Sequence, residues 1–225
     1  MFKGKRVILV GPSVSLKNSN MGTIIDSYDV VCRIKKSYPV DPKDHKDLGT
    51  RTDVLVSHLK VSGKGGYKQN NFESYPIQIY NQLKYIYFPF PLVKPFVNFY
   101  TGFVKKYGNL IKTSIVLPSD NQIYQMLHSE LGYDPTTGLM FIVDVVLRQE
   151  VKELCITGIT FQTDGFYESY KTPTEDKACV LRTQNIHNSS KELIFFRAFY
   201  QKYKNVIRLD EKLFDLISFG ENISI

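Results

Sequence analysis

Short apolar runs alternate with helix-like patterns along the whole chain. Between and after the apolar runs, apolar residues recur at helical spacing over 119–130, 137–149 and 188–203, and a short helical stretch covers 21–26. The stretch 137–149 is apolar nearly all round, which is typical of a helix buried against a sheet. Six apolar runs predict buried strands: 7–10, 29–34, 53–57, 83–88, 153–157 and 206–209.

Strands that alternate with helices predict an α/β fold. We expect a mostly parallel central sheet flanked by helices, with ligands bound beyond the carboxyl ends of the strands. No internal repeat and no linker divides the chain, so residues 1–225 are predicted to form a single Rossmann-like domain. Residues 60–76, rich in Gly, Lys, Asn and Ser, predict one long mobile loop.

The composition is that of a globular protein with a sizeable core. The chain has 225 residues, of which 43% are hydrophobic, and this excludes disordered and collagen-like classes. Its longest apolar runs are well short of the roughly 18 residues that a membrane span needs, and the apolar stretch near the N-terminus is too short for a signal peptide. The three cysteines are an odd number without CxxC spacing. We therefore expect a protein of the reducing cytoplasm, without a disulfide framework.

The charge is moderately positive. Lys and Arg total 29 against 22 acids, which gives a net charge of +7 and would suit a polyanionic partner or an anionic membrane surface. The basic residues are dispersed, however, and no nucleic-acid-binding motif is present. A solvated basic surface is therefore favoured over nucleic-acid binding, with at most peripheral contact with the inner face of a membrane.

A first candidate anion site follows the first predicted strand. Gly11 and Ser13 stand in the turn, polar residues fill 15–20, and the helical stretch 21–26 comes next. A glycine lets the backbone approach a ligand, and the amides at the start of a helix face an anion. The turn matches neither GxGxxG nor GxxxxGK[ST], the motifs that are typical of NAD and ATP sites, so binding of NAD or ATP here is not favoured. A purely structural turn is an equally good interpretation.

A second candidate precedes the buried helix at 137–149. Thr136, Thr137 and Gly138 offer two hydroxyls and several free amides where the helix dipole favours negative charge. Ordinary N-capping by one of the threonines explains this segment slightly better when it is taken alone. Two such turns in one α/β sheet nevertheless suggest a phosphorylated ligand held from both sides.

Histidines and acids supply the remaining candidates. His187 lies just before the last predicted helix, with Glu192 five residues on, and could act as a general base near neutral pH. His58, at the end of a predicted strand, could line the same cleft. No two acids are separated by a single residue, the pattern that commonly holds Mg²⁺ with phosphate, so we expect no metal. Asp41, Asp44 and Asp47, like Glu175 and Asp176, are predicted to be solvated loop charges.

Taken in chain order, these segments resemble the sialylmotifs of the sialyltransferases of glycosyltransferase family 29. The large motif is similar to residues 7–36, with Gly11, Ser13, Leu16, Gly22, the sequence IDSYD at 25–29, and Arg33, and it is followed by GTRTDV from Gly49. The small motif is similar to residues 135–161, and the very small motif, His and Glu separated by four residues, is met by His187 and Glu192.

The resemblance implies a Rossmann-like variant of the GT-A fold and an inverting glycosyltransferase that uses a CMP-linked acidic sugar without a metal. His187 is then the general base that deprotonates the acceptor hydroxyl. Tyr167 and Tyr170 fall in the family's aromatic segment, although simple loop packing explains them equally well. The residues implied to bind the CMP donor are Gly11, Ser13, Arg33, Lys35, Thr136, Thr137, Gly138, Tyr170 and Glu192.

The chain also departs from the family pattern. Pro12 and Lys35 stand where asparagines are usual, and the histidine of the third motif is absent unless Tyr167 or Tyr170 replaces it. The cysteine pair and membrane anchor of animal members are missing as well, which suggests a bacterial or viral member in the cytosol. Three alternatives remain: a catalytically decayed binding protein of the same fold, a transferase with another nucleotide-linked donor, and a nucleic-acid-binding domain.

The donor sugar and the acceptor stay open at this stage. CMP-sialic acid and CMP-Kdo are both CMP-linked 2-keto acid sugars, and the resemblance allows either. The acceptor is expected to be a glycan or a lipid-linked saccharide. Residues 85–108 mix aromatics with lysines and would suit an acceptor platform or a lipid-facing surface, although a core strand followed by a buried loop and helix is the favoured interpretation.

Overall fold

The computed structural model describes residues 1–61, 72, 75–118, 120–167 and 187–218. Its centre is a seven-stranded sheet in the order β5-β4-β3-β2-β1-β6-β7, and all neighbouring strands are parallel. The predicted α/β class with a parallel sheet is confirmed. The strands are β1 Arg6–Val10, β2 Val30–Ile34, β3 Val54–Val56, β4 Tyr85–Tyr87, β5 Ser114–Val116, β6 Glu153–Thr157 and β7 Ile207–Leu209.

The order of the strands reverses at β1. Strands β2, β3, β4 and β5 follow one another on one side of β1. The chain then crosses back, and β6 pairs with the other side of β1. In the register, Val10 lies opposite Arg33 of β2 and opposite Thr157 of β6. Ligands of open parallel sheets bind outside the carboxyl ends of the strands at such a switch point.

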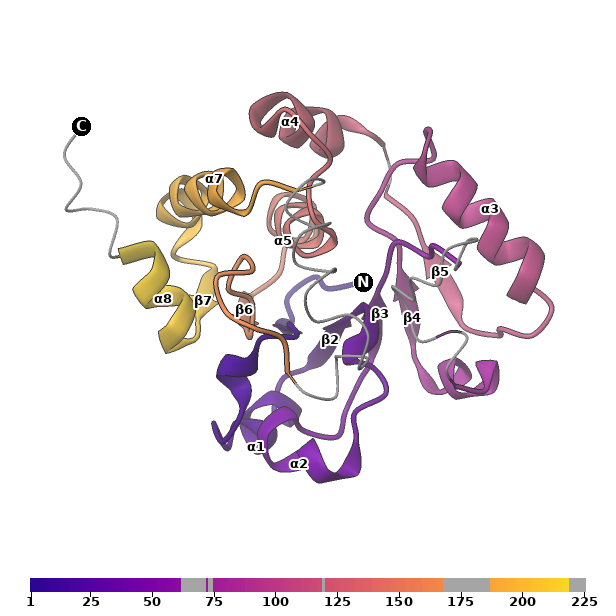
Figure 1. Cartoon of the computed structure of the whole chain (residues 1–225), viewed down its shortest axis with the longest axis horizontal. Coiled ribbons are helices and arrows are strands. Elements are labelled where there is room, and N and C mark those ends of the chain that lie inside the picture. The colour runs from indigo at the N-terminus through magenta and orange to yellow at the C-terminus, as the bar shows by residue number, and fades with distance from the viewer. Residues whose placement is uncertain (62–71, 73–74, 119, 168–186, 219–225) are drawn as a thin grey trace.

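Helices cover both faces of the sheet (Figure 1). The short helices α1 Gly22–Asp26 and α2 His45–Leu48 lie on one face, and α4, α5 and α7 lie on the other. Helix α3 is placed at the β4–β5 end, and α8 follows β7. The bounds of these are α3 Phe96–Tyr107, α4 Gln122–Leu131, α5 Thr137–Arg148, α7 Ser189–Tyr203 and α8 Glu211–Ser218, and short 3₁₀ turns are η1 Val14–Leu16, η2 Lys35–Ser37, η3 Pro42–Asp44 and η5 Ile77–Gln82.

Side chains of β1 alternate between two hydrophobic cores. Ile8 and Val10 pack in a smaller core with Ile25 of α1, whereas Val7 and Leu9 join the main core that contains α5. Successive side chains of a strand point to opposite faces, so burial on both faces requires a continuous apolar run rather than alternation. This explains why VILV is apolar throughout. Within the described residues, no helix is long and apolar enough to cross a bilayer.

The predicted elements match the observed ones closely in the centre of the sheet. The strand runs 7–10 and 153–157 correspond to β1 and β6, and the helix predicted over 137–149 is α5. Helix α4 begins at Gln122 rather than at 119, a position that is not described. Most of the loop predicted over 60–76 also lies outside the described residues. The sequence pattern did not predict β5 and α8.

Candidate active site

The turns after β1 and β6 touch at the carboxyl edge of the sheet. The amide of Gly11 donates to the carbonyl of Thr157 at 2.8 Å, and the amide of Ser13 donates to the carbonyl of Gly158 at 2.9 Å. A Cβ atom on Gly11 would lie 2.2 Å from the Gly158 oxygen. Gly11 therefore allows the two strand ends to approach each other directly at the switch point.

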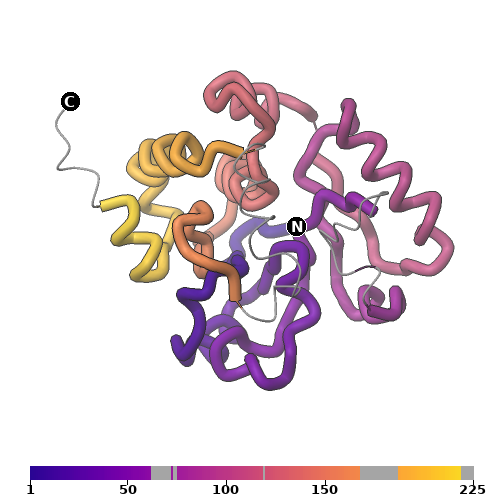
Figure 2. Tube along the Cα trace, in the orientation of Figure 1, coloured from indigo at the N-terminus to yellow at the C-terminus, as the bar shows by residue number. Residues whose placement is uncertain are grey.

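Ser13 is fixed inside the first turn. Its side chain is 3% exposed, accepts a hydrogen bond from the Ser15 amide at 3.1 Å and donates to the Ser15 hydroxyl at 2.9 Å. The chain after β6 runs back alongside this turn (Figure 2), where the Tyr167 amide donates to the Pro12 carbonyl at 2.7 Å. The turn is thus rigidly held, and a contact between Ser13 and a donor stays a prediction.

The start of α5 lies at the same edge of the sheet, close to the end of β2. Thr136 caps the helix, because its hydroxyl accepts a hydrogen bond from the Leu139 amide. A Cβ on Gly138 would lie 3.2 Å from the end of the Ile34 side chain, so glycine lets this helix start sit close to the end of β2. Among the described residues the amides of Thr137 and Gly138 have no hydrogen-bond partner. Free amides and the helix dipole make this position suitable for an anion.

Glu192 joins the start of α7 to the start of α5. Its two carboxylate oxygens accept hydrogen bonds from the amide of Thr136 at 2.7 Å and from the hydroxyl of Thr136 at 2.8 Å. The side chain is 1% exposed, and this burial raises the pKa of Glu192 to about 7 against the opposing effects of Thr136 and the Lys35 charge. Glu192 therefore positions the second anion turn.

His187 is held in the orientation that a general base needs. It precedes Asn188, whose side chain caps α7, and its Nδ1 lies 2.9 Å from the carbonyl oxygen of Asp134. A carbonyl only accepts, so Nδ1 carries the hydrogen and neutral His187 keeps a lone pair on Nε2. Among the described residues, Nε2 has no hydrogen-bond partner. Burial lowers the pKa of His187, and Lys35 acts in the same direction, against the Asp134 bond.

Lys35 brings positive charge to the same place. It follows β2 with a left-handed backbone (φ 47°), and its charge acts on both His187 and Glu192. Electrostatic interactions weaken with distance, so these effects place the Lys35 charge in the neighbourhood of both groups. The structure thus gathers six of the sequence-predicted residues at the carboxyl edge: Lys35, Thr136, Thr137, Gly138, His187 and Glu192.

The lowered pKa of His187 predicts where the pH–rate profile rises on its acid side. The rate constant kcat/KM is expected to rise with pH as His187 loses its proton, along a limb centred below the ordinary pKa of 6.5. The substitution Lys35→Met removes a cation that lowers this pKa and is expected to move the limb upward. A measured pH–rate profile with a limb above 6.5, or one that Lys35→Met leaves in place, would contradict this assignment.

Arg33 lies beneath the edge rather than at it. It is 0% exposed, and its Nε donates to the Thr52 hydroxyl at 2.9 Å while Nη2 donates to the carbonyls of Leu48 and Arg51. Burial lowers its pKa to about 10, so the guanidinium stays charged at neutral pH. These bonds fasten the connection between α2 and β3 to the sheet, and direct donor contact by Arg33 stays a prediction.

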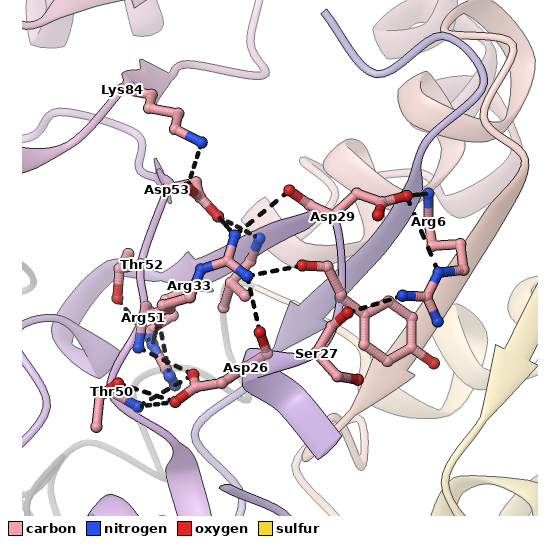
Figure 3. A network of polar contacts seen from close by, with 12 residues as sticks. Arg6, Asp26, Ser27, Asp29, Arg33, Thr50, Arg51, Thr52, Asp53 and Lys84 are labelled. Atoms are coloured by element: carbon pink, nitrogen blue, oxygen red, sulfur yellow. Dashed lines mark hydrogen bonds and ion pairs between the residues drawn. The ribbon is translucent and has the colours of Figure 1, made fainter. Parts of the chain in front are cut away.

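Other residues of the motif-like segments form a network at the opposite edge (Figure 3). The Asp26 carboxylate accepts from the amides of Thr50 and Arg51 at 2.8 and 2.9 Å, and the Arg51 guanidinium donates to the Asp26 carbonyl at 2.7 Å. Arg51 and Lys84 each pair with Asp53 at 2.8 Å. Because Asp53 and Lys84 directly precede β3 and β4, this network joins the amino ends of the strands. Its role is to hold the fold.

Tyr167 contributes to loop packing. Its hydroxyl donates to the Asp47 carboxylate at 3.1 Å, and the same carboxylate accepts from the amides of Asn18 and Asn20 at 2.7 and 3.0 Å. The prediction that Asp44 and Asp47 are solvated is wrong, because both are buried and Asp47 ties three distant groups together. Tyr170 lies outside the described residues.

His58 follows the carboxyl end of β3, and its place in the cleft around His187 stays a prediction. It is buried beside Phe99, with ring centroids 5.9 Å apart.

Two further residues shape the site without having been predicted. Asp134 orients His187 through its backbone carbonyl, so its side-chain type gives no signal in the sequence. Asp210, which follows β7, accepts hydrogen bonds from the Gly158 amide at 2.7 Å and the Thr157 hydroxyl at 3.0 Å. Within the described part of the chain, no group of three His, Cys, Asp or Glu residues is placed to hold a metal ion. Metal independence stays a prediction.

The family model for glycosyltransferase family 29 (sialyltransferase) matches residues 3–204. The chain belongs to this family. A search of curated proteins found no match. As a family 29 protein the chain is a CMP-sugar-dependent glycosyltransferase, and the family predicted from the motifs is confirmed.

Solved structures of mammalian sialyltransferases share the fold. One resembles the chain with a TM-score of 0.58 at 15% identity, over 92% of this chain and 68% of that chain. Another, solved in complex with Gal-beta-1-3GalNAc-ortho-nitrophenol, gives a TM-score of 0.56 at 15% identity, over 92% of this chain and 69% of that chain. The family 29 chain therefore has the sialyltransferase fold.

Proposed function

We propose that this family 29 protein is an inverting, metal-independent transferase of the cytoplasm that moves sialic acid or Kdo from its CMP-linked form to a hydroxyl of a glycan or lipid-linked saccharide. The observation that carries the proposal is the fixed tautomer of His187. The Asp134 carbonyl holds Nδ1, and this leaves Nε2 to accept a proton beside the free amides of α5.

The start of α5 supplies the groups that a CMP phosphate needs. Amides of Thr137 and Gly138 can donate to the phosphate oxygens, and Lys35 adds a positive charge close to this helix start through its proximity to Glu192. Charge-assisted hydrogen bonds of this type stabilise the negative charge that grows on a leaving phosphate. In this scheme the protein itself, rather than a metal, stabilises departing CMP.

His187 performs the proton transfer. The acceptor hydroxyl attacks the anomeric carbon while its proton passes to Nε2, the bond from that carbon to the phosphate oxygen breaks, and CMP leaves with the bonding electrons. A single displacement of this kind inverts the anomeric configuration. The low pKa of His187 keeps the imidazole neutral, and therefore basic, at neutral pH.

Thr137 tests the phosphate position separately from the base. The substitution Thr137→Val keeps the shape of this buried side chain at the helix start but removes its hydroxyl. If that hydroxyl donates to the phosphate, CMP is expected to bind about tenfold more weakly, in line with the loss of one hydrogen bond to a charged group. Calorimetric titration measures this change. An unchanged Kd would remove Thr137 from the donor site.

The proposed reaction is tested by product analysis in EDTA. The protein is incubated with CMP-sialic acid or CMP-Kdo and a panel of galactosides and lipid-linked saccharides, and the anomeric configuration of the product is read by NMR. Inverted product that forms in EDTA supports the proposal. Retained configuration, or turnover that needs an added divalent ion, would overturn its mechanism.

A further inference from the structure

The Asp134 carbonyl that binds His187 lies in a short connection, residues 132–135, between α4 and α5. The connection belongs to neither helix, and it starts at Gly132, which has a left-handed backbone (φ 82°). Among the described residues, the amides of Tyr133 and Asp134 have no backbone acceptor. The direction of the Asp134 carbonyl must therefore be set by side chains and by the stiffness of the connection itself.

Tyr124 of α4 anchors the side chain of Asp134. Its hydroxyl donates to Oδ1 of Asp134 at 2.6 Å, a distance typical of a strong hydrogen bond to a carboxylate. Burial, and then the contact with Asp134, raises the pKa of Tyr124 well above its ordinary value of 10.0, so the hydroxyl keeps the proton that it donates. Within the described part of the chain, Tyr124 and His187 are the two side chains that hydrogen-bond to Asp134.

The ring of Tyr124 is itself held from α3. It meets the buried ring of Phe96 edge to face, with centroids 5.4 Å apart and planes at 80°. Aromatic pairs prefer this arrangement, which restricts the ring on which the hydroxyl sits. Because the contact uses the ring alone, a phenylalanine at position 124 can keep it.

Pro135 removes much of the remaining freedom of Asp134. A residue that precedes a proline is largely restricted to extended backbone, which limits the rotation that turns its carbonyl. The next amide, that of Thr136, is bound by a buried carboxylate of α7 at 2.7 Å. With its carboxylate tied to Tyr124 and the following peptide held, Asp134 keeps its carbonyl 2.9 Å from Nδ1 of His187.

Other contacts between this connection and α7 act at neighbouring positions. The Tyr133 hydroxyl donates to the carbonyl of Asn188 at 3.1 Å, and Nζ of Lys191 donates to the carbonyl of Leu131 at 3.2 Å. These bonds place the start of α7 against the connection. They leave the orientation of the Asp134 carbonyl to the contact from α4.

We propose that Tyr124 is a positioning residue: through Asp134 it holds His187 in the tautomer that carries the hydrogen on Nδ1. Neutral histidine in water favours the opposite tautomer, so the lone pair on Nε2 of His187 depends on the acceptor at Nδ1. The tautomer is a property of the folded chain, whereas its use in catalysis rests on the proposed function.

The first experiment determines the tautomer without any substrate. The protein is labelled with nitrogen isotope in its histidines, and the ring nitrogens are observed by long-range proton–nitrogen NMR. At about pH 8 the ring of His187 is neutral, because its pKa lies below the ordinary value. The chain has four histidines, and the signals that are missing from His187→Ala identify those of His187.

Three variants change the contact between Tyr124 and Asp134. Tyr124→Phe removes the hydroxyl and keeps the ring, and Asp134→Ala removes the same hydrogen bond from its other end. Asp134→Asn keeps an oxygen that can accept from Tyr124. The control is Tyr200→Phe, the same chemical change on a half-buried tyrosine of α7 that packs against the main core.

The wild type, Asp134→Asn and Tyr200→Phe are expected to carry the hydrogen on Nδ1 of His187. In Tyr124→Phe and Asp134→Ala, the shifts of both ring nitrogens are expected to move towards those of free neutral histidine. Unchanged His187 signals in Tyr124→Phe would overturn the proposal, because the tautomer would not depend on the hydroxyl. An equal movement in Tyr200→Phe would overturn it as well, since the effect would then not be specific to this contact.

The second experiment measures the consequence for transfer. Single-turnover transfer by Tyr124→Phe is expected to be slower by about 10- to 100-fold, while the Kd of CMP stays that of the wild type. The double variant Tyr124→Phe/His187→Ala is expected to be no slower than His187→Ala, because the hydroxyl acts through the imidazole. A further loss in the double variant would overturn the proposal.

The two experiments separate this inference from the proposed function. If Tyr124→Phe shifts the tautomer of His187 and transfers at the wild-type rate, the positioning by Tyr124 is supported, and the result counts against His187 as the general base. If the tautomer is unchanged while His187→Ala loses transfer, the base is supported and the positioning by Tyr124 is overturned.

Discussion

Transfer by the His187→Ala variant is expected to be slower by about 10² to 10⁴-fold, the usual range for loss of a general base, while CMP binds as in the wild type. The imidazole is the group whose Nδ1 is bonded to Asp134 and whose Nε2 is left to accept the proton. The phosphate site at the start of α5 does not depend on this side chain. Single-turnover rates with CMP-sialic acid or CMP-Kdo, compared with calorimetric Kd values for CMP, separate the two effects.

His128 provides the matched control for this variant. It is an exposed histidine on α4 whose ring lies against Tyr124. His128→Ala is expected to keep the wild-type rate of transfer. Equal rates for His187→Ala and the wild type would remove His187 from the mechanism, and a parallel loss of CMP binding would make its role structural.

Gly11→Ala is expected to destabilise the protein by more than about 3 kcal/mol or to prevent folding. The added Cβ would lie 2.2 Å from the carbonyl oxygen of Gly158 and 2.8 Å from its carbonyl carbon. These are backbone atoms of the turn after β6, so the strand ends must separate to make room. The separation breaks the bonds that close the switch point, including the one from Ser13 to Gly158. Urea unfolding measures the loss.

Gly102→Ala is the control for the same chemical change. Gly102 lies in α3, and a Cβ there would meet no atom within 4 Å. Alanine in a helix is favoured over glycine by roughly 0.5 to 1 kcal/mol, so this variant is expected to be slightly more stable than the wild type. If the urea unfolding midpoint of Gly11→Ala equals that of the wild type, the close approach of the two turns is not a requirement of the fold.

The central strands could be predicted from the sequence because burial on both faces leaves a strong signal. Runs such as VILV at 7–10 are apolar throughout, and α5 is apolar nearly all round because it is buried. β5 has only three residues at the edge of the sheet, none of them buried, so it carries no such pattern. α8 has only eight residues, so its apolar positions repeat over little more than two turns, although Asp210 caps its start by accepting a hydrogen bond from the Leu213 amide.

The site could be predicted only in part, because much of it depends on contacts between distant segments. Motif spacing selected His187 and Glu192, yet the sequence does not show that Glu192 accepts both of its hydrogen bonds from Thr136, 56 positions away. The partner of His187 is a backbone carbonyl, for which no residue type is required. The prediction that Asp47 is solvated was wrong because its partners are also distant in the sequence. Its buried carboxylate binds amides 27 and 29 positions earlier in the chain, and nothing in the local pattern indicates this.

The central claim, that the carboxyl edge around β1, β6 and α5 binds a CMP-linked donor without a metal, is tested most directly by calorimetric titration of CMP in buffer that contains EDTA. UMP, GDP and NAD serve as control ligands. The account predicts micromolar CMP binding that EDTA does not change and that is much tighter than binding of the three controls. Absence of CMP binding, or binding that appears only when a divalent ion is added, would contradict it.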